Sequence, residues 1–72
     1  MKIFNEFVDV VIIQHDNLYQ YARNHVGSER DALRHTILVF EELKIHLSKN
    51  TKPDNIDKWL INKMDSSLRG NL

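Results

Sequence analysis

The sequence predicts an all-α protein, a compact three-helix bundle. Three segments, residues 2–24, 29–47 and 55–68, carry apolar side chains at the three- and four-residue spacing of helices. Two breaks separate them, Val26-Gly27 and the polar stretch from Ser48 to Pro53. A chain of 72 residues has room for one domain, which we expect to span residues 1–72.

The first predicted helix, residues 2–24, directs one apolar face toward the core. The run of residues 10–13 is β-branched and has strand propensity, but a lone strand would have no partner, so we expect a helix. Gly27 is expected to end it in the left-handed conformation. The predicted core face consists of Phe7, Val11, Leu18 and Ala22, with Val10 and Tyr21 at its edge.

Ser28 is the predicted N-cap of the second helix, with Glu29 and Asp31 in the first turn, where the helix dipole favours acidic groups. Apolar residues off the main face suggest that both neighbouring helices pack on this one. They are Leu33 and Ile37 on one side, and Leu38 and Ile45 on the other. The predicted core face consists of Ala32, Thr36, Val39, Phe40, Leu43 and Leu47.

The third helix is expected to follow Pro53, because proline keeps the preceding residue out of helical geometry. Asp54 or Asn55 can cap it, and Gly70 is expected to end it. Its predicted core face consists of Ile56, Trp59, Leu60, Met64 and Leu68.

Composition excludes several classes of function. The chain has no cysteine, which excludes disulfides and thiolate metal sites and fits a reducing cytoplasm. Its longest apolar run, residues 10–13, is far shorter than the span of about 20 residues that a membrane helix needs. The formal net charge of zero argues against nucleic acid as the main partner. We therefore expect a cytoplasmic protein that contacts no membrane and needs no cofactor.

Residues 7–68 resemble the core-binding helical domain, region 2, of extracytoplasmic-function sigma factors. The family has a Phe eleven residues before a Leu-Tyr-x-Tyr-Ala run, matched by Phe7 and residues 18–22. A Val-Gly turn follows, and then an Asp-Ala pair with a Val-Phe pair eight residues on, matched by Asp31-Ala32 and Val39-Phe40. A Trp-Leu pair in the last helix corresponds to Trp59-Leu60.

The resemblance implies a partner surface on the second helix. In the family, an acidic pair and a Gln after Asp-Ala dock on the clamp helices of the RNA polymerase largest subunit. Here the acidic pair is Leu33-Arg34 and the Gln is Ile37, so hydrogen-bonding capacity is lost there. The partner-binding residues that we infer are Asp31, Leu33, Arg34, Ile37, Leu38 and Glu41.

Leu33 and Ile37 have two interpretations. They form an exposed apolar patch for a partner helix, or they are covered by the first or the third helix. The first helix carries a matching second apolar stripe, formed by Val8, Ile12 and Tyr19.

Promoter reading is expected to be weak or absent. The family's last helix carries an Asn and a basic tail that open the promoter, whereas this chain has Asp65-Ser66-Ser67-Leu68-Arg69. Only Lys63 and Arg69 remain as weak DNA contacts, because Trp59 is expected to belong to the core.

The histidines allow an alternative, enzymatic interpretation. Arg30 and His35 have the spacing of the Arg-x4-His motif of helical HEPN ribonucleases, where Arg would hold phosphate and His would act as acid or base. A metal site is not expected, because no two of the four histidines are three or four residues apart. His35 and His46 are expected to be half-buried packing residues.

The leading hypothesis is a non-enzymatic protein-binding module of transcription. Such a module would bind the RNA polymerase clamp or an anti-sigma factor, and could act beside a separate promoter-reading subunit. The alternatives are a minimal HEPN-type ribonuclease and a helical module that forms homodimers through its surplus apolar stripes.

Overall fold

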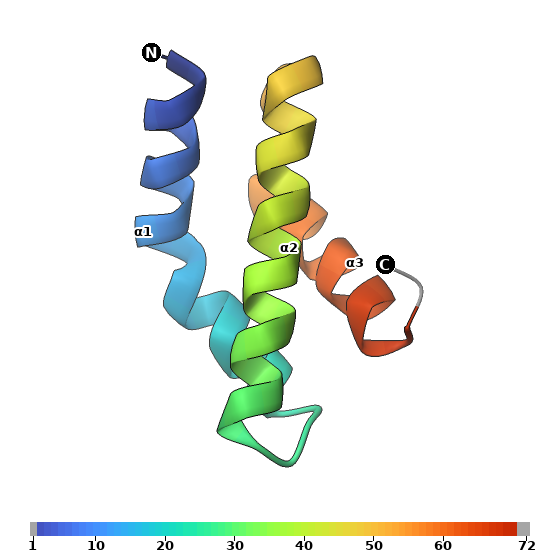
Figure 1. The fold of residues 1–72 in the computed structure, drawn as a ribbon. Helices are drawn as coiled ribbons and strands as arrows, with labels where there is room; N and C mark the ends of the chain where they lie inside the picture. Colours follow the sequence, from blue (N-terminus) through green and yellow to red (C-terminus); the bar gives the residue numbers. More distant parts are fainter. Residues whose placement is uncertain (1, 71–72) are drawn as a thin grey trace.

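The computed structural model describes residues 2–70, with side chains from residue 6 onward. Its helices are α1 (Lys2–Arg23), α2 (Glu29–Lys49) and α3 (Ile56–Leu68), and residues 2–70 contain no strand (Figure 1). The prediction of an all-α three-helix bundle is therefore confirmed. No helix in this range is long and apolar enough to cross a membrane.

Side-chain caps set where α2 and α3 begin. The Ser28 hydroxyl accepts a hydrogen bond from the backbone N–H of Asp31 at 3.1 Å, as the sequence predicts. Asn55 caps α3 in the same way by accepting from the N–H of Lys58, and helix geometry begins one residue later than predicted. α2 continues two residues beyond the predicted Leu47, to Lys49.

The two glycines behave differently from each other. Gly70 has a φ of 80° directly after α3, which is the left-handed conformation expected at a helix end. The same prediction for Gly27 is wrong, because Gly70 is the only glycine with positive φ in residues 2–70. α1 ends instead in a tight turn, in which the N–H groups of His25 and Val26 both donate to the carbonyl of Ala22.

α2 is the central helix and contacts both α1 and α3 (Figure 1). All six residues predicted for its core face are buried, and Leu43, Val39 and Thr36 are completely buried. The hydroxyl of Thr36 donates to the carbonyl of Ala32 and so needs no partner outside the helix. From the other helices, the buried apolar residues are Val10, Leu18, Ala22, Leu60 and Met64.

Polar contacts fix how the helices sit on one another. The hydroxyl of Tyr21 on α1 donates to Oδ1 of Asp65 on α3 at 2.5 Å. Gln14 donates to Asp57 between the same two helices. Because both contacts join α1 to α3 at different heights, together they limit rotation of α3 against α1.

Candidate functional site

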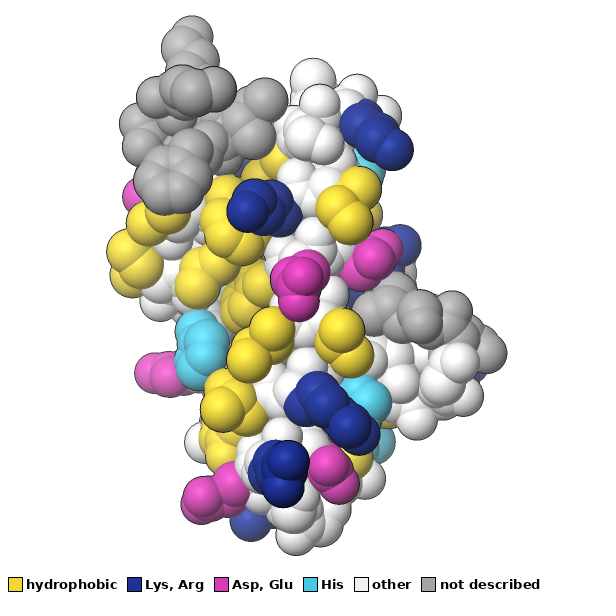
Figure 2. Space-filling model, in the orientation of Figure 1, with side chains coloured by type: hydrophobic (Ala, Val, Ile, Leu, Met, Phe, Trp, Pro, Cys, Tyr) yellow, Lys and Arg dark blue, Asp and Glu magenta, His cyan; other side chains and the backbone are white. Residues whose placement is uncertain are grey.

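One side of α2 is covered by neither α1 nor α3. We call this side the outward face of α2 and define it by eight exposed residues: Arg30, Leu33, Arg34, Ile37, Leu38, Glu41, Lys44 and Ile45. Figure 2 shows charged side chains running along this face, with apolar side chains on either side of them. The remaining inferred partner-binding residue, Asp31, is exposed at the edge of the same helix.

Large apolar side chains are exposed on both flanks of the outward face. Leu33 and Ile37 are 44% and 50% exposed, and Leu38 and Ile45 on the other flank are 42% and 51% exposed. The interpretation in which α1 covers Leu33 and Ile37 is wrong, because Ile12 is itself 72% exposed. Leu38 and Ile45 are not covered by a neighbouring helix either, because about half of each side chain stays open to solvent. Their exposure is typical of a surface that binds another macromolecule.

The charges on this face are accessible. Arg34 forms an ion pair with Asp31 at 3.7 Å, one turn earlier, and both side chains are more than half exposed. Among the residues that the structure describes, Glu41 has no ion-pair partner. Exposed pairs of this kind stabilise a helix little, so both Arg34 and Glu41 can pair with another molecule.

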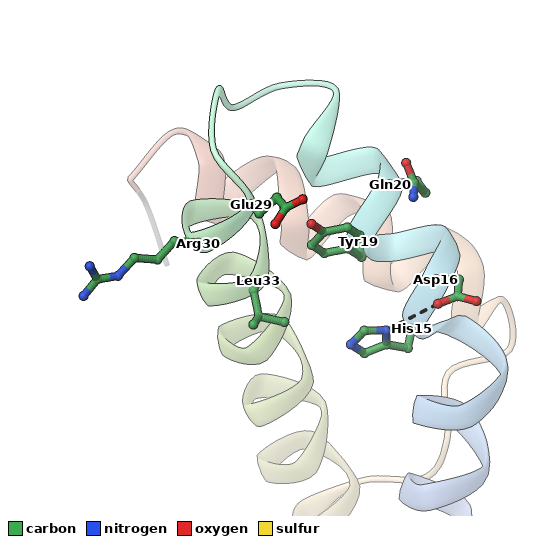
Figure 3. Close-up of a pocket in the computed structure, with 7 residues that line it drawn as sticks. All are labelled: His15, Asp16, Tyr19, Gln20, Glu29, Arg30 and Leu33. Carbon is green, nitrogen blue, oxygen red and sulfur yellow. Dashed lines mark ion pairs between the residues drawn. The ribbon is translucent and has the colours of Figure 1, made fainter.

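A shallow hollow of about 650 Å³ lies beside the outward face, between α1 and the start of α2. In Figure 3, His15 and Leu33 point toward each other across it, Glu29 points toward Tyr19, and Arg30 points away. The rings of His15 and Tyr19 are nearly parallel, with centroids 6.4 Å apart. This hollow could not be predicted from the sequence, because it depends on how the two helices are rotated against each other.

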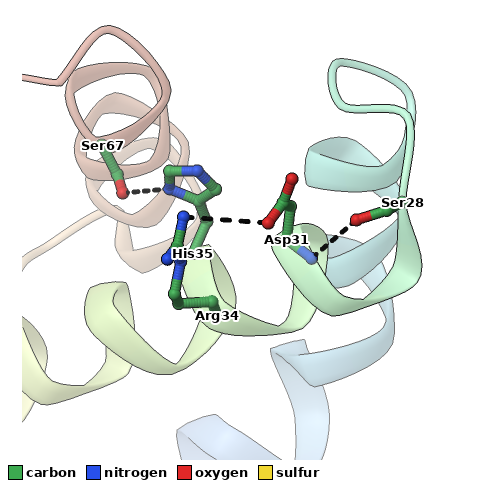
Figure 4. A network of polar contacts seen from close by, with 5 residues as sticks. All are labelled: Ser28, Asp31, Arg34, His35 and Ser67. Atoms are coloured by element: carbon green, nitrogen blue, oxygen red, sulfur yellow. Dashed lines mark hydrogen bonds and ion pairs between the residues drawn. The ribbon is translucent and has the colours of Figure 1, made fainter.

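The two residues of the ribonuclease-like motif lie on different sides of α2. Arg30 belongs to the outward face, whereas Nδ1 of His35 lies 2.6 Å from Oγ of Ser67 on α3 (Figure 4). A separation of five residues corresponds to about 140° around a helix, which explains the divergence. One chain therefore does not direct both side chains at a single phosphate group.

The weak DNA contacts inferred from the sequence are also separated. Nζ of Lys63 lies 5.3 Å from the centroid of the Trp59 ring, close enough for a cation–π interaction. Trp59 is partly buried against the core and tilts against His46, at 5.2 Å between ring centroids. Arg69 lies exposed at the C-terminal end of α3. Six residues separate Lys63 from Arg69, which corresponds to about 120° around a helix, so the two side chains do not form one basic surface.

The histidines of α2 are packing residues at the edge of the core. His35 and His46 are both half-buried, as predicted. Within residues 6–70, no group of three or more His, Asp or Glu side chains is placed to hold a metal ion.

Comparison of the chain with protein-family models, with curated proteins and with solved structures finds no match.

Proposed function

We propose that this protein is a protein-binding module of transcription, built like sigma factor region 2, whose α2 contacts a helical partner. The partner is the clamp of the RNA polymerase largest subunit or an anti-sigma factor. The module reads promoter DNA weakly or not at all by itself, and in a split arrangement a separate subunit would read the promoter.

The exposure of the outward face of α2 is the observation that carries this proposal. Asp31, Leu33, Arg34, Ile37, Leu38 and Glu41, the six residues inferred from the family resemblance, are all exposed. Apolar anchors one turn apart, such as Leu33 and Ile37, suit a groove or a helix in the partner. The charged neighbours Arg34 and Glu41 can then fix the orientation of the partner on α2.

The hollow next to Leu33 supports the same assignment. An apolar side chain of a partner helix lying along α2 would fit between Leu33 and the rings of His15 and Tyr19. Interfaces concentrate their binding energy in such pockets.

A direct binding measurement tests the proposal. The immobilised chain is exposed to purified RNA polymerase core enzyme, to an isolated clamp-helix fragment, and to a bacterial lysate whose captured proteins are identified by mass spectrometry. We expect binding of the polymerase clamp or capture of an anti-sigma factor. Recovery of neither class would refute the proposal.

Matched variants locate the contact. Leu33→Asp with Ile37→Asp should abolish binding and keep the helical circular dichroism spectrum, because both side chains are exposed. The control is Ile12→Asp with Ile13→Asp, which places the same charges on exposed apolar positions of α1, 72% and 69% exposed, and should leave binding intact. Loss of helicity in the first variant would show instead that Leu33 and Ile37 are needed for folding.

A further inference from the structure

The charges on the outward face of α2 are arranged so that this face complements itself. Arg34 and Glu41 are seven residues apart, which is close to two helical turns, so both point in nearly the same direction. Ile37 and Leu38 lie between them, and the midpoint of the charged pair coincides with the midpoint of the apolar pair.

We propose that two copies of the chain associate through this face, with their α2 helices antiparallel about a twofold axis that passes between Ile37 and Leu38. In this arrangement Arg34 of each copy faces Glu41 of the other, and two identical ion pairs form. Near the axis, Ile37 packs on Ile37 of the second copy, and Leu38 packs on its own counterpart. A twofold interface requires such self-complementarity.

The direction of pairing follows from the charges. If the two α2 helices ran parallel about a twofold axis, residues of the same number would lie at the same height. Arg34 would then face Arg34, and Glu41 would face Glu41, which places like charges together. Only the antiparallel arrangement brings opposite charges together on both sides of the apolar centre.

The surroundings of α2 leave room for a second copy. α2 stands in front of α1 and α3 in the view of Figure 1, and the same view in Figure 2 shows its outward face uncovered. The four large apolar side chains on this face, between 42% and 51% exposed, lose contact with water when a second α2 covers them.

The self-association goes beyond the proposed function, because it needs no transcription partner. It occupies Leu33, Arg34, Ile37 and Glu41, so a chain that is paired with a second copy cannot present the same face to another protein. A partner and the second copy therefore compete, and self-association sets the concentration of the binding-competent chain.

Sedimentation of the purified chain tests the proposal by charge reversal. The interface is the size of one helix face, so the wild-type dimer is expected to be weak and to require concentrations up to about 1 mM. The change Arg34→Glu places a second carboxylate opposite Glu41, and the change Glu41→Arg places a second guanidinium opposite Arg34. The dissociation constant of each single variant should be at least about tenfold higher than that of the wild-type dimer.

An equimolar mixture of the two single variants is the decisive sample. The Arg34→Glu copy carries an acidic group at both positions, and the Glu41→Arg copy carries a basic group at both positions. Position 34 of one copy meets position 41 of the other, so in the mixed dimer both pairs combine an acidic group with a basic group. The mixture should therefore recover association close to that of the wild type, whereas each variant alone associates weakly.

The double variant Arg34→Glu with Glu41→Arg restores the complementarity. Each copy then carries an acidic group at position 34 and a basic group at position 41, so both pairs across the twofold axis again combine opposite charges. This variant should recover the wild-type dimerisation. The control Lys58→Glu reverses an exposed charge on α3 and should not change it.

Two results would overturn the inference. One is a wild-type chain that stays monomeric over the whole concentration range. The other is a dimer that is unchanged by both single reversals, which would place the interface elsewhere. Since these samples contain only the purified chain, failure here is distinguishable from failure to bind polymerase or an anti-sigma factor.

Discussion

His35 and Ser67 join α2 to the last turn of α3 by a hydrogen bond of 2.6 Å between Nδ1 and Oγ. Ser67 is only 5% exposed and His35 is half-buried, so the hydrogen bond lies at the edge of the core. It gives the C-terminal end of α3 a specific polar anchor in addition to the contacts of Leu60 and Met64.

Removal of this anchor should destabilise the fold measurably. Ser67→Ala should lower the free energy of unfolding by about 1 kcal/mol, because His35 loses a partly buried partner. A double-mutant cycle with His35→Ala, followed by urea unfolding, should give a coupling energy of about 0.5–1.5 kcal/mol. Ser66→Ala is the control, because no hydrogen bond of the Ser66 side chain is seen among the described residues. Equal effects of the two serine variants would contradict the assignment.

The N-cap Ser28 should contribute more to the stability of the fold than the hydroxyl of Ser48 at the other end of α2. Ser28→Ala removes the acceptor for the Asp31 N–H and should lower the free energy of unfolding by about 1 kcal/mol. Ser48→Ala removes only an exposed hydrogen bond to the carbonyl of Ile45 and should change stability much less. Thermal unfolding followed by circular dichroism compares the two, and the opposite order would show that Ser28 does not cap the helix.

Two leucines of α2 should respond differently to truncation. Leu43 is completely buried, so Leu43→Ala should lower the free energy of unfolding by about 2–5 kcal/mol, a large part of the total of about 5–15 kcal/mol typical of a domain. Leu33 is 44% exposed, so Leu33→Ala should change it little. Urea unfolding measures both free energies. A large loss of stability in Leu33→Ala would mean that Leu33 packs as a core residue and is not free to bind a partner.

The hydrogen bond from Tyr21 to Asp65 should be visible in a pH titration. The bond stabilises the protonated phenol, and the pKa of Tyr21 is therefore raised above its ordinary value, with burial and the Asp65 charge acting in the same direction. Since the folded-state pKa is raised, this stabilisation is fully present below about pH 10, the unfolded pKa. It is lost as pH rises through the folded pKa.

Tyr19→Phe isolates this titration, because the chain has only two tyrosines. The tyrosinate absorbance of that variant should appear at higher pH in the folded protein than in urea. Tyr21→Phe should lower the unfolding temperature near neutral pH, and this difference from wild type should shrink at strongly alkaline pH. Titration at the same pH in the folded and unfolded states would contradict the proposed role of Asp65.

Local sequence pattern was sufficient to predict the helices and the inner side of α2. All six residues predicted for its core face are buried, because one apolar stripe with helical spacing specifies which side of a helix faces inward. The cap Ser28 was also predicted, and Asn55 is one of the two caps that the sequence allowed, since these hydrogen bonds lie within a few residues.

The outer side of α2 could not be predicted in the same way. Whether Leu33 and Ile37 are covered depends on the angle at which α1 crosses α2, and no local pattern specifies that angle. The same reason explains why the pairs His35–Ser67 and Tyr21–Asp65 were not predicted. Their members are more than thirty residues apart and meet only when the helices have been placed.

The separation of α2 into a buried side and an uncovered side has an evolutionary consequence. Ile37, Leu38 and Glu41 are exposed whereas Leu43 and Val39 are completely buried, so the effects of substitutions in the two groups on stability should largely add. Recognition can therefore drift or be redesigned on one side of a single helix while selection for a folded chain acts on the other.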